Sequence, residues 1–556
     1  MKISRRLFLR LFYFPLVKIS NDLAECKINR SIHFSGYDSR IGGERDELEN
    51  SSIIDYLIFS NQSDKLVIYV IGNNFLRGCN MQVIMSRYLH DKKQLLKELV
   101  SELSKAFKYA SILGTDICGK TYSVYKTGAS INDSEWTERG FVVRVHNGYN
   151  YTEYSFNSLS EEGIDSLVES IKNKVNDDIS RLKNSTVNIG TYPVIDEDKI
   201  IGEVFKEVEI LPEEVSAEEK IKKMTRIKDE AFTYSALLVD FRIVYGECHV
   251  SKIFISQNKD LEQSYIWSQG SLSAVVRRDH NTKFYYDSAA GLRGVELLDE
   301  LQHKIKEVVS YAEKLLDAKK IVPGQYDVIC SPGISGLIAH EAFGHGVEMD
   351  MFVKNRAKAA EFINKEVASE LVIMHDGAAA AENVSSYYFD DEGILGTDTK
   401  IIDRGILKTG ISDLLSALRL GTKPTGNGKR ESFERKAYAR MTNTFFEGGK
   451  DRLEDMISSI KEGYLLDVML SGMEDPKNWG IQCMILIAKE IKNGELTGNI
   501  MSPVIMTGYV PDVLKSISML SEKVEISGSG ACGKGYKEWV KAAEGGPYIK
   551  ARVRLG

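Results

Sequence analysis

The segment His340–His345, with the sequence HEAFGH, constrains this chain more than any other feature. Two imidazoles and a carboxylate on one short helical stretch are the groups of a hydrolytic zinc site: nitrogen ligands for the metal and a carboxylate that handles the proton of water. The histidines are five positions apart, whereas the H-E-x-x-H pattern places them four apart on one helical face. An ideal helix would turn the second imidazole roughly 140° from the first. Both reach one metal only if the helix widens or ends between them, which Gly344 and Gly346 permit.

The residues before this segment predict a rigid support for it. Tyr326–Cys330 is expected to form a strand, Pro332-Gly333 a turn, and a helix is expected to begin near Ile334. Packed elements hold a site more firmly than a mobile loop does. The spacing alone leaves two interpretations open, a metal site and a chance pairing of two of the nine histidines.

Cys532 is the best candidate for a third ligand, because a catalytic zinc usually takes three protein ligands and a water. It stands in the glycine-rich run GSGACGKG at residues 528–535, where the backbone can present a thiolate without steric hindrance. The neighbouring Lys534 would lower the pKa of that thiol. The alternative interpretation is a free thiol in a turn.

The composition is that of an ordinary globular protein, with 43% hydrophobic and 27% charged residues. A length of 556 residues predicts two or three domains. The net charge of 72 − 79 = −7 argues against a nucleic-acid-binding surface as the main role. No stretch approaches the roughly 20 apolar residues of a membrane span. We therefore expect neither nucleic acid nor a membrane among the partners.

The cysteines predict a cytoplasmic protein, because all seven are scattered and none forms a C-x-x-C pair. The alternative is export, since Ser4–Arg10 resembles a twin-arginine signal. Against export, the apolar stretch Leu11–Val17 is short and contains Pro15, and the lipobox before Cys26 is poor. Residues 1–80 are interpreted as an accessory leader or as an over-extended start.

The hydrophobic pattern predicts mixed helices and strands, followed by a glycine-rich C-terminal half that is mostly β. Residues 186–215 contain proline and acidic residues and are expected to be a loop or linker. The expected N-terminal helices are Asp91–Ala110, Ser160–Ile179, Ala217–Ile227 and Leu292–Ala318. The expected strands are Val142–Val145, Ala236–Tyr245, Val250–Gln257 and Leu272–Arg278.

Separate motifs keep a fixed order from about residue 85 to residue 556. The pattern H-E-x-x-x-H-G-x-E-x-D begins at His340 and is followed by Cys532-Gly533-Lys534 and by Gly545-Gly546-Pro547. Further segments of the same kind are Glu138–Gly140, Ser160–Gly163, Asp390–Gly393, Asp403–Gly405, Gly426–Ser432 and Arg440–Thr444. Together they resemble the TldD/PmbA metallopeptidase family.

The resemblance implies one Zn²⁺ per chain, bound by His340, His345 and Cys532, with Glu341 as general base and acid. It implies an unfolded, extended peptide as substrate. It also implies a homodimer, or a heterodimer with a related subunit that lacks the histidine motif, and this chain resembles the motif-bearing, TldD-like subunit. The chain departs from the family in its first 80 or so residues and in Gly533–Trp539, where the family usually continues with a polar Gln/Ser run.

The expected fold class is α+β, with the two-domain architecture that TldD/PmbA proteins imply. An N-terminal extension is expected at residues 1–84 and a mixed α/β N-terminal domain at residues 85–320. A β-rich C-terminal domain carrying the metal site is expected at residues 321–556.

The predicted function is zinc-dependent hydrolysis of peptide bonds, in leader-peptide processing or in clearance of an unfolded regulator. Glu348 or Asp350 would orient a ligand imidazole or be a helix-end charge, and Thr425–Arg430 would line the substrate cleft or form a tight turn. One alternative is a non-catalytic scaffold subunit with a structural metal, for which His375 is the nearest fourth ligand. A second is a small-molecule amidohydrolase or deaminase, whose H-x-E…P-C-x-x-C signature is absent. A third is a cysteine hydrolase using Cys532, which would survive chelation.

Overall fold

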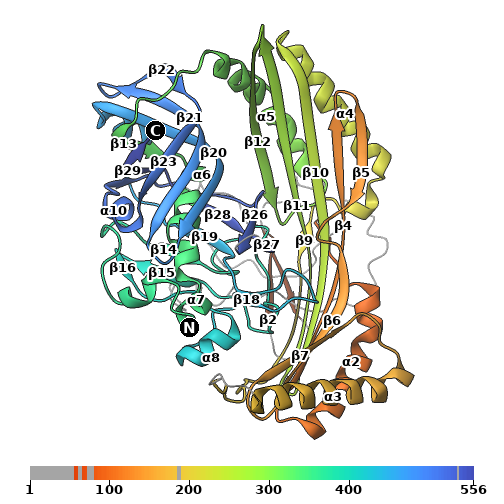
Figure 1. The fold of residues 1–556 in the computed structure, drawn as a ribbon. Helices are drawn as coiled ribbons and strands as arrows, with labels where there is room; N and C mark the ends of the chain where they lie inside the picture. The colour runs from red at the N-terminus through yellow and green to blue at the C-terminus, as the bar shows by residue number, and fades with distance from the viewer. Residues whose placement is uncertain (1–54, 61–65, 72–79, 185–189, 535–536) are drawn as a thin grey trace, which may run out of the picture. The chain divides into compact units, whose positions relative to one another are not determined.

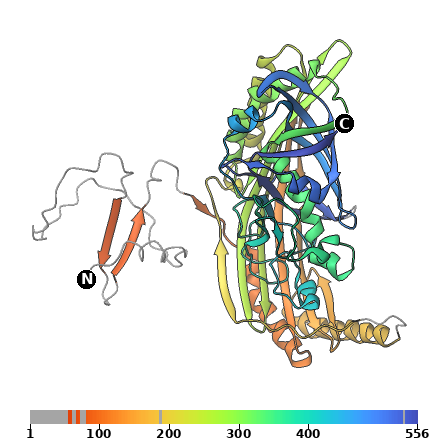
Figure 2. The ribbon, with the colours of Figure 1, turned by 90° about the vertical axis from the view of Figure 1, so that its left-hand side faces the viewer.

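The structure, a computed structural model, describes residues 55–60, 66–71, 80–184, 190–534 and 537–556. The chain divides into two units, residues 1–77 and residues 78–556. In the first unit, β1 (Asp55–Ser60) and β2 (Leu66–Ile71) form an antiparallel pair (Figure 2). The twin-arginine-like segment, the apolar stretch after it and Cys26 lie outside the described residues. The expected domain boundary between residues 320 and 321 stays a prediction.

The second unit begins with an eight-stranded sheet. Its strands are β4 (Ala110–Tyr125), β5 (Gly128–Asp133), β6 (Glu138–His146), β7 (Tyr151–Phe156), β8 (Ile200–Phe205), β10 (Leu238–Ser256), β11 (Lys259–Arg278) and β12 (Asn281–Gly291). The order is β12-β11-β10-β4-β6-β7, with β5 paired to β4 and β8 paired to β11. A further short pair joins β3 (Met81–Gln82) to β9 (Glu207–Val208).

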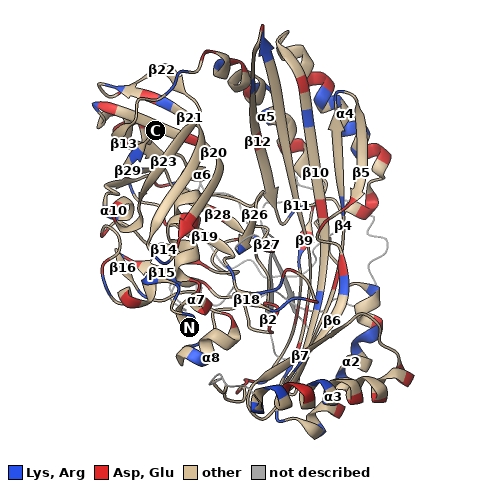
Figure 3. Ribbon diagram, viewed as in Figure 1, with Lys and Arg blue, Asp and Glu red and all other residues tan. Residues whose placement is uncertain are grey.

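Four helices accompany this sheet: α2 (Arg87–Ala106), α3 (Ile164–Lys183), α4 (Ala217–Tyr234) and α5 (Leu297–Lys314). Figure 1 shows α4 and α5 near one end of the long strands and α2 and α3 near the other. Alternate residues of β10, including Phe241, Ile243 and Tyr245, are buried in one cluster with the apolar sides of α4 and α5. Charged residues of both signs lie along α2, α3 and α4 (Figure 3), as expected for helices with one face toward water.

The expected N-terminal elements are present with shifted ends, and two expectations are wrong. The strands expected at Ala236–Tyr245 and Val250–Gln257 form the single strand β10, because its ladder with β4 and β11 continues through Gly246 and Cys248. The stretch expected as a linker at residues 186–215 contains β8 and β9, and β8 pairs in parallel with β11. The short apolar run of β8 becomes a strand here because it pairs with β11, a partner remote in sequence.

The C-terminal part contains two further sheets. The seven-stranded sheet comprises β13 (Gly324–Cys330), β20 (Glu462–Asp475), β21 (Gly480–Lys492), β22 (Glu495–Met501), β23 (Val504–Tyr509), β24 (Met519–Leu520) and β29 (Ile549–Leu555). The six-stranded sheet comprises β14 (Met374–Asp376), β15 (Thr399–Asp403), β16 (Ile406–Leu407), β19 (Asn443–Phe446), β25 (Glu525–Ser527) and β28 (Ala543–Gly546). Two small pairs are β17 (Gly428–Lys429) with β18 (Tyr438–Ala439), and β26 (Ala531–Lys534) with β27 (Lys537–Lys541). The α+β class and the β-rich C-terminal region are therefore confirmed.

Short helices connect these strands. They are α6 (Pro332–Leu337), α7 (Met349–Val353), α8 (Leu414–Leu420), α9 (Leu453–Ser458) and α10 (Val510–Lys515). The helix α6 contacts β20 of the seven-stranded sheet and β28, β25 and β19 of the six-stranded sheet. Because it is covered from both sides, its residues Ile334, Ser335 and Leu337 are all buried. Among the described residues, no helix is long and apolar enough to cross a membrane.

Candidate metal centre

The histidine motif lies on a widened helix that continues α6. Residues Ile338–Gly344 (η4) form a π-helix, and His345–Val347 (η5) form a 3₁₀ turn. The His345 N–H donates to the carbonyl of His340, five residues back. A π turn closes over five residues, so it places two side chains five apart on the same side, which a regular helix does not do. The predicted widening between the two histidines is confirmed.

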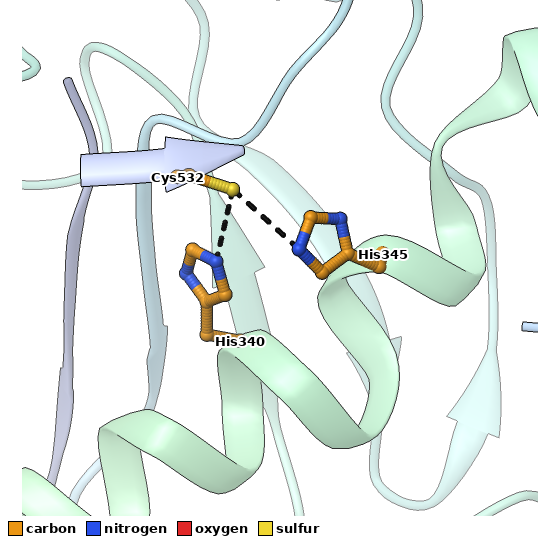
Figure 4. Close-up of side chains that lie close together, drawn as sticks. All are labelled: His340, His345 and Cys532. Atoms are coloured by element: carbon orange, nitrogen blue, oxygen red, sulfur yellow. Dashed lines mark hydrogen bonds between the residues drawn. The ribbon is translucent and has the colours of Figure 1, made fainter. Parts of the chain in front are cut away.

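Cys532 faces both imidazoles from β26 (Figure 4). Its Sγ lies 3.1 Å from Nε2 of His340 and 3.5 Å from Nε2 of His345. The three ligand atoms all lie within 4.8 Å of one another. Four-coordinate zinc binds nitrogen at about 2.0–2.1 Å and sulfur at about 2.3 Å, which separates neighbouring ligands by about 3.4 to 3.7 Å. The spacing and the donor types of the three residues fit a zinc ion.

The second nitrogen of each imidazole faces a carboxylate. Nδ1 of His340 lies 3.0 Å from Oε2 of Glu544, on β28, and Nδ1 of His345 lies 3.5 Å from Oε2 of Glu348. Carboxylates in these positions fix the ring orientation and direct Nε2 toward the ligand site. No sequence pattern predicted a role for Glu544. Its only signal was its place directly before the Gly545-Gly546-Pro547 motif.

Glu348 is itself held by two cations. Lys534 Nζ lies 3.0 Å from Oε2 of Glu348 and 2.6 Å from Oδ1 of Asp350, and Arg440 Nε lies 3.3 Å from Oε1 of Glu348. Burial alone would raise the pKa of Glu348, but Lys534 and His345 outweigh it and hold that pKa well below its usual range. Of the two candidates for orienting a ligand, Glu348 contacts an imidazole, and Asp350 reaches the site through Lys534.

The thiol and the imidazoles shift one another's protonation. Burial opposes ionisation of Cys532, yet the two imidazoles hold its pKa well below the usual range. For His345, burial lowers the pKa and the Cys532 thiolate and Glu348 raise it to about 10. The lowered pKa favours the thiolate of Cys532, which is the form of cysteine that binds metal.

Glu341 lies on η4 between the two histidines and packs against β20. A Cβ on Gly472 of β20 would approach Cγ of Glu341 to 2.5 Å, so glycine is required there to make room for the carboxylate. Burial raises the pKa of Glu341, against the opposing effect of His340 and His345.

Two other sequence candidates have different surroundings. His375, on β14, has Nδ1 2.6 Å from Oδ1 of Asp398 and Nε2 2.7 Å from Oε1 of Glu447, so both its nitrogens are engaged. Within the part of the chain that the structure describes, the metal-ligating cluster consists of three residues and does not include His375. In the stretch Thr425–Arg430, the last two residues line a cavity.

Comparison with known proteins agrees with this fold. The family described as PmbA/TldA metallopeptidase C-terminal domain matches residues 323–549. A metalloprotease of Methanocaldococcus jannaschii is 29% identical over 421 residues, covering 74% of this chain and 89% of the relative. A zinc metalloprotease TldD homolog of Saccharolobus solfataricus is 27% identical over 428 residues, covering 75% of this chain and 90% of the relative.

Among solved structures, TldE from Thermococcus kodakarensis matches with a TM-score of 0.60 and 19% sequence identity. The match covers 83% of this chain and 99% of that chain. This likeness shows that the two proteins share a fold. Residues 323–549 match the family's C-terminal domain, and the resemblance to the TldD/PmbA family that the motifs indicated is confirmed.

Proposed function

We propose that this protein is a zinc-dependent metallopeptidase that hydrolyses peptide bonds in unfolded or extended peptides. One Zn²⁺ per chain is bound by His340, His345 and Cys532, and Glu341 is the catalytic base and acid. The observation that carries the proposal is the convergence of the three ligand atoms, within 4.8 Å of one another, beside a helix that also bears the glutamate. The relatives named as metalloproteases support the same reaction class.

In this proposal each residue of the site has a separate role in hydrolysis. A bound zinc ion supplies Lewis acidity for attack on the scissile carbonyl. The carboxylate of Glu341 takes a proton from the attacking water and passes it to the leaving amine. Glu544 and Glu348 hold the two imidazoles through their Nδ1 atoms. A thiolate ligand donates charge to the metal and would make it a weaker Lewis acid than a site with three histidines. This suits a slow, selective processing enzyme more than a digestive one.

The number of protein ligands distinguishes this proposal from a scaffold with a structural metal. Structural zinc sites usually close with four protein ligands, and the cluster found among the described residues offers three. A zinc ion held by these three residues would keep one position for water or substrate. The free cysteines Cys118, Cys248, Cys330, Cys483 and Cys532 agree with a reducing compartment, and we propose the cytoplasm as the location.

The proposal also covers the kind of substrate and the partner subunit. We infer an extended peptide, recognised largely through its backbone by strand addition, with leader removal or clearance of an unfolded regulator as the biological task. We also infer a dimer, either of this chain or with a related subunit that lacks the histidine motif. The structural likeness to TldE supports the second form.

The test compares the zinc-loaded wild type with Glu341→Gln on an unfolded peptide, with zinc content measured for both. The wild type is expected to cut, while the variant keeps its zinc and loses at least a hundredfold in rate, as loss of a general base predicts. Activity that disappears with a chelator and returns with zinc excludes the cysteine hydrolase. Zinc bound without cleavage, alone and with the co-purified partner subunit, would leave the structural role standing and refute the peptidase.

A further inference from the structure

A charged cavity of about 80 Å³ lies between the large sheet and the C-terminal part. A single water needs about 10–15 Å³ of such space, so the cavity has room for a small charged group with a few waters. Its aromatic lining comprises Trp136, Trp267, Tyr265, Tyr387 and Phe389. Trp136 and Trp267 meet edge to face, with ring centroids 6.2 Å apart.

The carboxylates that line this cavity already have partners. Asp391 pairs with Lys252 and accepts the Arg430 N–H at 2.8 Å. Asp390 accepts the N–H groups of Glu392, Ile394 and Gly428 at 2.8 to 3.0 Å. The remaining two, Glu138 and Glu431, accept the N–H groups of Phe433 and Trp539.

The lysines Lys429 and Lys541 of the lining lack such charged partners, and their ammonium groups donate only to neutral oxygens. Lys541 Nζ donates to the Gly530 carbonyl at 2.8 Å and to Oε1 of Gln269, and it lies 5.0 Å from the centroid of the Trp267 ring. Lys429 Nζ donates to Oγ of Ser385 at 2.8 Å and to the carbonyls of Met441 and Lys541. Among the described residues, the lining cations Lys252 and Arg430 have carboxylate partners, whereas neither Lys429 nor Lys541 has a carboxylate oxygen within 4.0 Å of its Nζ.

A buried cation without an anion is costly, and a bound anion would remove that cost. Lys541 is 8% exposed. Burial lowers the pKa of both Lys429 and Lys541 to about 7, which agrees with the missing counter-charge. The aromatic walls add an apolar surface for the carbon atoms that carry such an anion.

The short strand pair β26–β27 connects the cavity to the metal centre. Cys532 of β26 pairs with Val540 of β27, and Ala531 pairs with Lys541. Val540 and Lys541 both line the cavity. Paired residues have Cα atoms about 4.5–5.5 Å apart, so a peptide whose scissile bond lies at Cys532 can reach the cavity with a nearby residue.

We propose that this cavity binds a carboxylate of the peptide substrate, with Lys541 as its main recognition residue and Lys429 beside it. The carboxylate is an Asp or Glu side chain near the scissile bond or the C-terminal carboxylate of a short product or substrate. This inference rests on the proposed peptidase function, since it names the substrate class of that same site. It makes the cavity a specificity pocket for acidic peptides.

The test measures binding and not turnover, so that it can fail independently of the peptidase proposal. Zinc-loaded Glu341→Gln protein is titrated by calorimetry with four forms of one unfolded peptide: Glu or Gln at the test position, each with a free or an amidated C-terminus. The expected result is about tenfold tighter binding of the form carrying the recognised carboxylate. The Glu–Gln comparison and the acid–amide comparison separate the two sources.

Substitutions of Lys541 then test whether this residue causes the preference for the carboxylate-bearing peptide. Lys541→Met in the same background is expected to reduce the tenfold preference to about one, and Lys541→Arg to restore most of it. Lys523→Met, at a side chain that is 82% exposed, is the matched control and keeps the preference. Equal binding of all four peptides, no binding of any, or an unchanged preference in a folded Lys541→Met variant overturns the proposal. If the wild type cuts acidic and neutral peptides equally, the cavity proposal fails and the peptidase proposal stands.

Discussion

Sγ of Cys532 lies 3.1 Å from Nε2 of His340, although the two residues are 192 positions apart in the chain. The strand pair β26–β27 carries the cysteine to the histidine-bearing helix, and Arg440 donates to the Cys532 carbonyl at 2.8 Å. The position of the thiol is therefore fixed by packed backbone as well as by its own side chain. Four expectations follow from this arrangement and from its surroundings.

Replacing Cys532 by serine is expected to lower zinc affinity at least a hundredfold, because zinc binds a thiolate and a serine hydroxyl is a far weaker acid than this thiol, whose pKa the two imidazoles lower. Peptidase activity should fall with the zinc content. The measurement is zinc per chain after dialysis against a weak chelator, alongside the cleavage rate. Cys483→Ser, at another buried free cysteine, should keep its zinc.

Lys534→Met is expected to weaken zinc binding by roughly 10- to 100-fold, the usual effect of losing support behind a ligand. Lys534 holds Glu348, and Glu348 faces Nδ1 of His345. Lys354→Met is the matched control, because Lys354 also pairs with Asp350, at 2.8 Å, without an ion pair to Glu348. A competition titration with a fluorescent zinc indicator measures both affinities, and equal losses in the two variants would refute the role of Lys534.

Gly472→Ala is expected to lower the cleavage rate about a hundredfold while zinc stays bound. The new Cβ would meet Cγ of Glu341 at 2.5 Å and displace the carboxylate, and a shift of about 1 Å at a reacting group has an effect of that size. Gly480→Ala is the control in the next strand, since a Cβ there meets nothing within 4 Å. A rate loss shared by both variants would point to the sheet and not to Glu341.

Glu153→Gln is expected to destabilise the fold by about 3 kcal/mol, the effect of breaking a buried ion pair. Glu153 on β7 lies 2.7 Å from Nη2 of Arg144 and 2.5 Å from Nη2 of Arg430. Burial would raise its pKa, but the two arginines hold that pKa well below its usual range.

The sign of the pH dependence follows from that lowered pKa. The carboxylate stabilises the folded state fully above the unfolded-chain pKa of about 4.3 and progressively less as the pH falls below it. Denaturant unfolding at pH 7 and at pH 4 or lower should show a large difference between wild type and variant that shrinks with acid. Glu169→Gln, at a side chain that is 65% exposed, should change stability by less than about 0.5 kcal/mol at either pH.

The parts of the site that could be predicted from the sequence are those that depend on residues close together in the chain. The five-residue spacing of His340 and His345 predicted a widened helix, because helical geometry is a local property. Glu544 gave no such signal, since a single glutamate before two glycines has many structural explanations. The strand β8 was missed because its partner β11 is remote, and because its short apolar run stands in a stretch that contains proline and acidic residues.

The sequence by itself determined the local elements and the reactive groups: the amphipathic helices, the widened turn of the motif, and a cysteine among glycines. The tertiary structure decided which of these groups meet. The packing of α6 between two sheets sets the depth of the histidines, and the β26–β27 ladder brings Cys532 to them and Lys541 to the neighbouring cavity. Such long-range contacts depend on strand pairing and on burial summed over many residues, which no single segment encodes.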